Sequence, residues 1–211
     1  MLFYEPQTRD KTVLPHDPFK ALIAPRPIGW VTTISTAGAI NLAPNSFLNA
    51  LSDRPPIIGF SSSGLKDSVT FVQETGQFVW NMPTYALRDA MNQTAAPLPR
   101  GQSEAAFARL EMVPSRLVKP PRVKESPAAL ECEVIEVKQL TDRHGTPIEN
   151  WLVIGQVVGV HIDEAFIKDG MVDIAAMQPI ARCGYMDYVV ADAVFQMKRP
   201  PRVLPDGSLE G

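Results

Sequence analysis

Short apolar runs, separated by turn-forming residues, follow one another along the first third of the chain. Residues 28–35 are rich in β-branched side chains and predict a strand, and residues 36–39 predict the turn after it. Residues 40–49 predict a second strand, which would complete a hairpin. After a turn at residues 53–56, residues 57–62 are apolar enough for a strand that is buried on both faces.

Residues 67–76 change from strand-like to helical spacing. Apolar side chains stand at positions 69, 71 and 72, Asp67 is placed to cap the start of a short helix, and Gly76 is placed to end it. Residues 78–82 predict a fourth strand. Thr84 is then placed to cap a second short helix.

The second half of the chain contains one long hairpin between irregular segments. Residues 93–104 are polar and rich in proline, which predicts a loop. Residues 128–140 alternate as a half-buried strand, and a turn at 143–146 leads into the longest predicted strand, residues 151–162. Residues 163–180 show no regular pattern.

The pattern as a whole predicts a mainly β fold. We expect about seven short strands and two or three short helices, without the strand–helix alternation of a parallel sheet. The 20 prolines outnumber the 13 glycines, and proline is excluded from helix interiors and central strands. An antiparallel β-barrel with a few short peripheral helices fits best. It would form one domain over residues 1–195, with residues 1–20 as an N-terminal arm and residues 196–211 as a flexible C-terminal tail.

Composition and charge narrow the class of protein. The formal net charge is -3, and no basic run could follow a phosphate backbone, so we expect no nucleic-acid partner. No apolar stretch approaches the roughly 20 residues of a membrane span, and the first residues lack the pattern of a signal peptide. We therefore expect no membrane association.

The cysteines and histidines indicate neither a disulfide framework nor a metal site. Cys132 and Cys183 are too few for a secreted disulfide scaffold, so we expect two reduced, buried thiols in a cytoplasmic protein. The three histidines lie far apart in the sequence, and no metal site is expected. The signatures of hydrolases, P-loops and dinucleotide-binding folds are missing from the sequence.

Two segments have the chemistry of a binding site. Pro44 removes a backbone donor, so its strand should be an edge or carry a bulge, and the peptide groups of residues 45–47 could bind a flat heteroaromatic ring. Residues 61–68 (SSSGLKDS) lie between a buried strand and a helix start, where hydroxyls, one lysine and the helix N-terminus could hold a phosphate. An ordinary edge strand and an ordinary capped loop remain the alternatives.

Three single residues are further candidates. His161, near the end of the longest strand, is either structural or, beside a bound redox cofactor, a proton donor or a contact to the electron donor. Tyr185 could stack on a ring or pack as one buried aromatic. Arg26 is held between two prolines, and its simplest role would be a surface ion pair.

Several runs of residues resemble the flavin reductase-like family with an FMN-binding split barrel, most closely its flavoredoxin branch. The runs are residues 24–33 (APRPIGWVTT), 41–47 (NLAPNSF), 55–56 (PP), 66–68 (KDS), 131–133 (ECE), 155–161 (GQVVGVH) and 182–185 (RCGY). Their order and spacing cover roughly residues 20 to 190. The family often has leucine at the position of Cys183 and threonine at that of Ser68.

The resemblance implies a Greek-key split barrel that forms a homodimer, with FMN near the dimer interface. The flavin ring would lie along residues 45–47, and its phosphate would be held by the loop before the helix. The expected cofactor-binding residues are Arg26, Thr33, Asn45, Ser46, Phe47, Ser61, Ser62, Ser63, Lys66, Ser68, Thr70 and Tyr185, and His161 is the candidate catalytic residue.

The implied function is that of an oxidoreductase that transfers hydride from NAD(P)H to FMN. Reduced flavin would then serve an oxygenase or another acceptor protein. Two alternatives remain open: an electron carrier that keeps its FMN, and a non-enzymatic FMN-binding protein.

Overall fold

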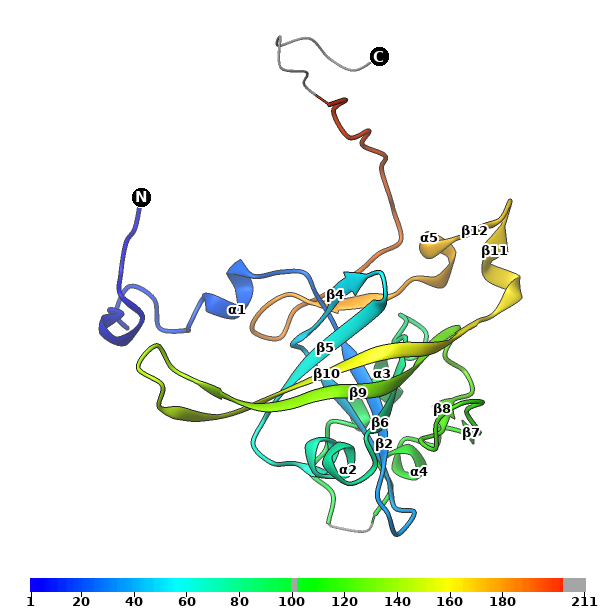
Figure 1. Cartoon of the computed structure of the whole chain (residues 1–211). Helices are drawn as coiled ribbons and strands as arrows, with labels where there is room; N and C mark the ends of the chain where they lie inside the picture. Colours follow the sequence, from blue (N-terminus) through cyan, green and yellow to red (C-terminus); the bar gives the residue numbers. More distant parts are fainter. Residues whose placement is uncertain (100–101, 203–211) are drawn as a thin grey trace.

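The computed structural model describes residues 1–99 and 102–202, and strands dominate it (Figure 1). Seven antiparallel strands form the main sheet, in the spatial order β3-β2-β6-β9-β10-β5-β4. Their bounds are β2 (Gly29–Ile34), β3 (Ile40–Asn45), β4 (Leu48–Asp53), β5 (Pro56–Ser63), β6 (Gln77–Asn81), β9 (Ala128–Thr141) and β10 (Pro147–Ile162).

The sheet is rolled, because two strands that follow each other in the chain are its opposite edges. β3 ends at Asn45 and β4 begins at Leu48, so only Ser46 and Phe47 lie between the two edges. Three virtual bonds span at most about 11 Å, which forces these corners of the sheet together. β3 pairs with β2 and β4 pairs with β5, and the two edges are not hydrogen-bonded to each other. The result is a split barrel whose two edges are joined through residues 45–47, as the family resemblance implied.

A glycine allows this close approach. A Cβ on Gly29 of β2 would lie 3.0 Å from the side chain of Leu48 on β4. Since Leu48 is buried in the barrel, β2 and β4 can meet at this corner only because position 29 has no side chain.

Smaller elements surround the barrel. A three-stranded sheet contains β1 (Arg26–Pro27), β13 (Ile180–Arg182) and β14 (Tyr188–Val190), and two short pairs contain β7 (Met112–Val113) with β8 (Arg122–Val123) and β11 (Ile167–Lys168) with β12 (Met171–Val172). The helices are α1 (Phe19–Leu22), α2 (Asp67–Thr75), α3 (Arg88–Gln93), α4 (Glu104–Phe107) and α5 (Ile174–Met177), with 3-10 turns η1 (Pro6–Thr8) and η2 (Glu164–Phe166).

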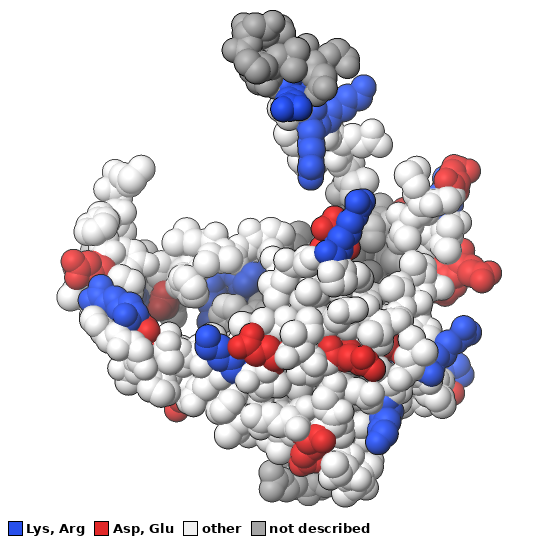
Figure 2. All heavy atoms as spheres, in the orientation of Figure 1, with Lys and Arg blue, Asp and Glu red and all other residues white. Residues whose placement is uncertain are grey.

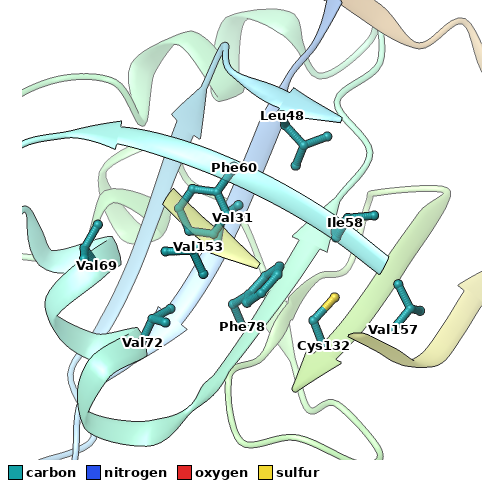
Figure 3. Close-up of a cluster of buried hydrophobic side chains, with 10 residues drawn as sticks. All are labelled: Val31, Leu48, Ile58, Phe60, Val69, Val72, Phe78, Cys132, Val153 and Val157. Atoms are coloured by element: carbon teal, nitrogen blue, oxygen red, sulfur yellow. The ribbon is translucent and has the colours of Figure 1, made fainter. Parts of the chain in front are cut away.

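The barrel interior is filled by aliphatic side chains around two aromatic rings (Figure 3). Phe60 and Phe78 meet edge to face with ring centroids 5.4 Å apart, a favourable aromatic arrangement. Val69 and Val72 of α2 reach into the same cluster, so this helix covers one end of the barrel. A second cluster around Trp30 connects the barrel to α3 and α4.

Gly155 is the most closely packed glycine of the core, so a side chain at this position should lower the stability of the protein. A Cβ at this position of β10 would lie 2.4 Å from the ring of Phe78, which is fully buried. We expect Gly155→Ala to destabilise the protein by about 1–3 kcal/mol, because the core cannot yield without moving the ring. Gly159→Ala on the same strand is the control, since its nearest contacts would be 3.4 Å. Equal urea midpoints for the two variants would contradict the packing described here.

The strands and helices of the first half follow the prediction with two exceptions. The predicted strand over residues 40–49 is in fact β3 and the start of β4, because the chain crosses from one edge of the sheet to the other after Asn45. β3 is an edge strand, as Pro44 indicated. Thr84 does not cap α3, which begins at Arg88, because Thr84 is buried in an isolated β-bridge with Pro179.

The ends of α2 illustrate both a confirmed and a wrong prediction. Gly76 ends the helix in the left-handed conformation, with a φ of 69°. The predicted cap at Asp67 is wrong, since the N-cap position is Lys66 and Asp67 is the first helical residue. Residues 163–180 are more regular than predicted and contain η2, β11, β12 and α5.

Both ends of the described chain leave the barrel as extended segments (Figure 1). Residues 1–18 contain only η1, and residues 191–202 contain neither helix nor strand. Residues 203–211 of the predicted tail and residues 100–101 of the predicted loop lie outside the described residues. No helix in the described part of the chain has the length and apolar character needed to cross a membrane.

Candidate functional site

The open corner of the barrel exposes the segment between β3 and β4. The carbonyl oxygen of Phe47 accepts a hydrogen bond of 2.8 Å from the backbone N–H of Ser61, so the segment is fastened to β5. The Phe47 ring is partly exposed, and the cationic groups of Lys20 and Arg26 lie 5.9 and 5.7 Å from its centroid. Figure 2 shows basic side chains in the hollow between the N-terminal arm and the barrel.

Arg26 lies beneath this corner and is buried, with 6% of its surface exposed. Its Nε donates to the carbonyl oxygen of Ser46 at 3.1 Å, and its Nη1 donates to that of Cys183 at 2.9 Å. Nη1 also donates to the carbonyl oxygens of Lys20 and Ile23. The simple alternative of a surface ion pair is therefore wrong, because Arg26 ties the N-terminal segment, the β3–β4 link and the turn after β13 together.

Two buried donors at the corner lack partners. The Nη2 of Arg26 and the side-chain Nδ2 of Asn45 are inaccessible to solvent, and neither has a hydrogen-bond partner among residues 1–99 and 102–202. Buried polar groups in native proteins are nearly always paired, because an unpaired one costs about 1–3 kcal/mol. Such donors are the feature expected of a site whose ligand supplies the acceptors.

A cavity of about 230 Å³ opens at the same corner. It is lined from β3 by Pro44, from the link by Ser46, and from the turn after β13 by Gly184 and Tyr185. Tyr185 is 51% exposed, and its ring meets that of His16 edge to face at 6.0 Å. Of the two predicted roles for Tyr185, a buried packing residue is therefore wrong, and an accessible ring remains.

Three of the predicted phosphate ligands in the loop between β5 and α2 differ in their exposure to solvent. Ser62 is buried, whereas Ser63 and Lys66 are exposed. The backbone N–H groups of Val69 and Thr70 both donate to the carbonyl oxygen of Lys66, which starts the helix. The exposed lysine thus stands at the positive end of α2.

Two predicted hydroxyl ligands face inward. Thr33 and Ser68 are buried, and the amide Nδ2 of Asn41 donates to both hydroxyls, at 3.3 and 2.9 Å. Asn41 therefore fixes α2 against β2 and β3, a role that its place in the motif did not reveal. Thr70 is half-buried on α2, and the Oγ of Ser61 accepts a bond of 3.5 Å from Asn150.

His161 lies in a different place, paired with a buried carboxylate. Its Nε2 is 2.5 Å from Oε1 of Glu131, which is completely buried on the neighbouring strand β9. The carboxylate also accepts the backbone N–H groups of Arg116, Leu117 and Val118, at 2.7, 2.6 and 3.1 Å. Glu131 thereby holds the segment before β8 onto the barrel.

Several opposing influences act on the pKa of Glu131. Burial is the largest and raises it, but the hydrogen bonds from the Arg116 N–H, His161, and the Leu117 and Val118 N–H groups together outweigh burial. The pKa of this carboxyl is therefore below its ordinary value, and the group is ionised at neutral pH. Glu131 is part of the family-like motif at residues 131–133, but its role depends on contacts with segments that are distant in the sequence.

A larger cleft, of about 620 Å³, opens beside this pair. Arg116, Arg122 and Lys124 line it together with His161, and the Nε of Arg122 is buried without a partner in the described part of the chain. This cleft and the cavity at the 45–47 corner share no lining residue, so His161 lies outside the cavity at that corner in one protomer.

The two cysteines are free thiols with different surroundings. Burial, and secondarily the charge of Glu131, raises the pKa of the Cys132 thiol, so this group stays protonated and belongs to the core. The expected burial of Cys183 is wrong: this residue is half-buried, because it lies in the turn after β13, where its carbonyl oxygen accepts a hydrogen bond from Arg26.

Comparison with known proteins identifies the class to which this split barrel belongs. Residues 22–175 match the sequence model of the flavin reductase like domain, and the chain belongs to this family. An uncharacterized protein of Halalkalibacterium halodurans, BH2278, is 37% identical over 183 residues, which cover 84% of this chain and 87% of that protein. The family predicted from the sequence motifs is thus confirmed.

Solved structures agree with this assignment. Nitrilotriacetate monooxygenase component B from Bacillus cereus has a TM-score of 0.84 at 29% identity, covering 93% of this chain and 98% of that chain. Flavoredoxin of Desulfovibrio vulgaris (Miyazaki F) shares the fold, with a TM-score of 0.72 at 23% identity, covering 82% of this chain and 90% of that chain. Family and neighbours point to a flavin-linked oxidoreductase.

Proposed function

We propose that this protein binds FMN at the open corner of the barrel and acts as an NAD(P)H-dependent flavin reductase in the cytoplasm. The observation that carries the proposal is the buried Nη2 of Arg26, which has no partner among the described residues and belongs to a side chain that lines a cavity of about 230 Å³, in a member of the flavin reductase like family. The second unpartnered donor, Nδ2 of Asn45, is at the adjoining end of β3. The isoalloxazine ring offers carbonyl and ring-nitrogen acceptors that such donors would satisfy.

The surrounding residues fit the rest of the cofactor. Pro44 and Ser46 line one side of the cavity, and Tyr185 supplies an accessible aromatic face. Lys66 and the exposed hydroxyl of Ser63, at the positive end of α2, supply the charge and hydrogen bonds that a phosphate requires.

Bound FMN would supply the hydride acceptor for a reduced nicotinamide. Arg26 places a buried positive charge at the corner, which favours the negative charge that a flavin ring gains on reduction. Its bonds to four backbone carbonyls hold that charge in place. The half-exposed corner leaves one side for a second molecule to approach.

We propose that the nicotinamide donor binds in the cleft beside His161. Arg116, Arg122 and Lys124 line this cleft together with Glu125, Glu131 and Asp163. The buried Nε of Arg122, which has no partner among the described residues, is the donor proposed to bind a phosphate of NAD(P)H, and His161 is placed to contact the ring. Since the cleft and the cavity at the 45–47 corner share no lining residue in one protomer, the proposal includes a homodimer in which the cleft of one protomer serves the flavin of the other.

The cleft assignment predicts the behaviour of Arg122→Gln. Because Arg122 would contact phosphates in ground state and transition state alike, we expect the KM for NADH to rise about tenfold with kcat nearly unchanged. Steady-state rates at saturating FMN measure both constants, and Arg143→Gln in the distant β9–β10 turn is the control. An unchanged KM would contradict binding of the donor in this cleft.

An experiment can distinguish two uses of the reduced flavin. The similarity to nitrilotriacetate monooxygenase component B supports a reductase that releases reduced flavin to an oxygenase, whereas the fold shared with flavoredoxin is the argument for a carrier that keeps its FMN. Gel filtration of the FMN-loaded protein, followed by NADH oxidation with and without added FMN, separates them. Loss of flavin and FMN-dependent turnover support the reductase, and retained flavin with turnover only through an acceptor protein supports the carrier.

A further inference from the structure

A second cavity, of about 380 Å³, continues from the one at the flavin corner. The two cavities share Met91, Arg182 and Tyr188, so they adjoin each other; together they are called the depression, which reaches from Ser46 to α3. The proposed function uses only the end near Ser46. The far end has the volume typical of a small-molecule site.

Two arginine–tyrosine pairs line the far end. The guanidinium of Arg88 lies 4.1 Å from the ring centroid of Tyr85, and that of Arg182 lies 4.4 Å from the ring centroid of Tyr188. Each guanidinium is also fixed by a hydrogen bond to a backbone carbonyl, Arg88 to Tyr85 at 2.6 Å and Arg182 to Tyr185. Both planar cations are therefore held in position before any ligand arrives.

The floor of this end is apolar. Met91 and Ile180 are buried, with 2% and 5% of their surfaces exposed, and Val190 is half-buried. Asp89 is the one acidic residue among those that line the cavity, and it lies 3.6 Å from Arg88 on the exposed side. Asp89 pairs with Arg88, and no ion pair with a described residue neutralises Arg182, so the far end keeps a positive charge.

We propose that the far end of the depression binds a planar aromatic carboxylate. The apolar floor and the tyrosine rings accept a flat ring, and a guanidinium presents paired N–H groups that match the two oxygens of a carboxylate. Since Arg182 and Tyr188 belong to both cavities, the bound ring would lie beside the flavin. That last statement rests on the proposed function, whereas the binding of the carboxylate does not.

The test is a titration of flavin-free protein with three probes. Benzoate carries ring and charge, benzamide carries the ring without the charge, and cyclohexanecarboxylate carries the charge without the flat ring. We expect benzoate to bind about tenfold more tightly than either of the others. Arg88→Gln and Arg182→Gln should each weaken benzoate binding about tenfold, and Arg143→Gln, an exposed arginine outside both cavities, should leave it unchanged.

The outcomes separate this proposal from the proposed function. Equal affinity for benzoate and benzamide, unchanged binding in both variants, or displacement of benzoate by NADH would overturn the carboxylate site. Far-ultraviolet circular dichroism of the variants establishes that they fold. Failure of the protein to bind FMN, measured separately, would leave the benzoate result intact and would count against the proposed function alone.

Discussion

Lys66→Gln is expected to weaken FMN binding about 10–100-fold while changing riboflavin binding by less than about twofold. A charge-assisted hydrogen bond contributes about 1.5–3 kcal/mol, and only FMN carries the phosphate that would receive it. Lys66 is exposed and stands at the N-cap of α2, so its side chain can be replaced without disturbing the core. Quenching of flavin fluorescence measures both affinities.

The comparison with riboflavin makes this prediction specific. Lys168→Gln, at an exposed lysine on β11, removes the same charge and is expected to bind FMN as the unchanged protein does. Equal losses for FMN and riboflavin in the Lys66 variant would place the lysine near the ring. Unchanged affinity for both ligands would contradict the proposal that the phosphate binds Lys66 at the start of α2.

Glu131→Gln is expected to lower the free energy of unfolding by about 2–4 kcal/mol at neutral pH. The buried carboxylate accepts three backbone N–H groups and contacts His161, and a glutamine would turn an amide NH₂ toward donors that need an acceptor. Urea unfolding measures the loss. Glu133→Gln is the matched control, because Glu133 is on the same strand and exposed.

The same variant predicts a pH dependence with a definite sign. The folded pKa of Glu131 is below the ordinary value of 4.5, so its contribution is fully present above about pH 4.5 and is lost as the pH falls through the folded pKa. The stability difference between the unchanged protein and Glu131→Gln should therefore shrink in acid. A difference that stays constant from neutral pH down to strongly acidic pH, or no difference at all, would be evidence against the buried ionised carboxylate.

Local pattern was enough to predict the elements whose cause is local. β2, β5 and α2 were predicted because β-branched runs and helical spacing act within a few residues. The end of α2 was predicted because Gly76 readily adopts the left-handed backbone conformation. The β3–β4 boundary was missed, because it depends on a crossing from one edge of the rolled sheet to the other. Thr84 was misread as a cap because its partner, Pro179, is distant in sequence.

The site divides in the same way. Pro44 indicated an edge strand, and only the family resemblance made residues 45–47 a binding segment, whereas the burial of Arg26 depends on carbonyl groups from three separate segments. The Glu131–His161 pair joins two strands, and the alternation of β9 alone does not show that position 131 faces a loop of backbone donors. Arg88 and Arg182 come together only through the packing of α3 against β13 and β14.

The visible spectrum of the purified protein, loaded with FMN and mixed with NADH or NADPH without oxygen, tests the central claim most directly. The account predicts flavin absorption bands that remain with the protein and bleach when the nicotinamide is added. Protein that stays colourless after incubation with FMN would contradict the cofactor assignment. Bound flavin that neither nicotinamide reduces would contradict the reductase activity, and only the FMN-binding part of the proposal would stand.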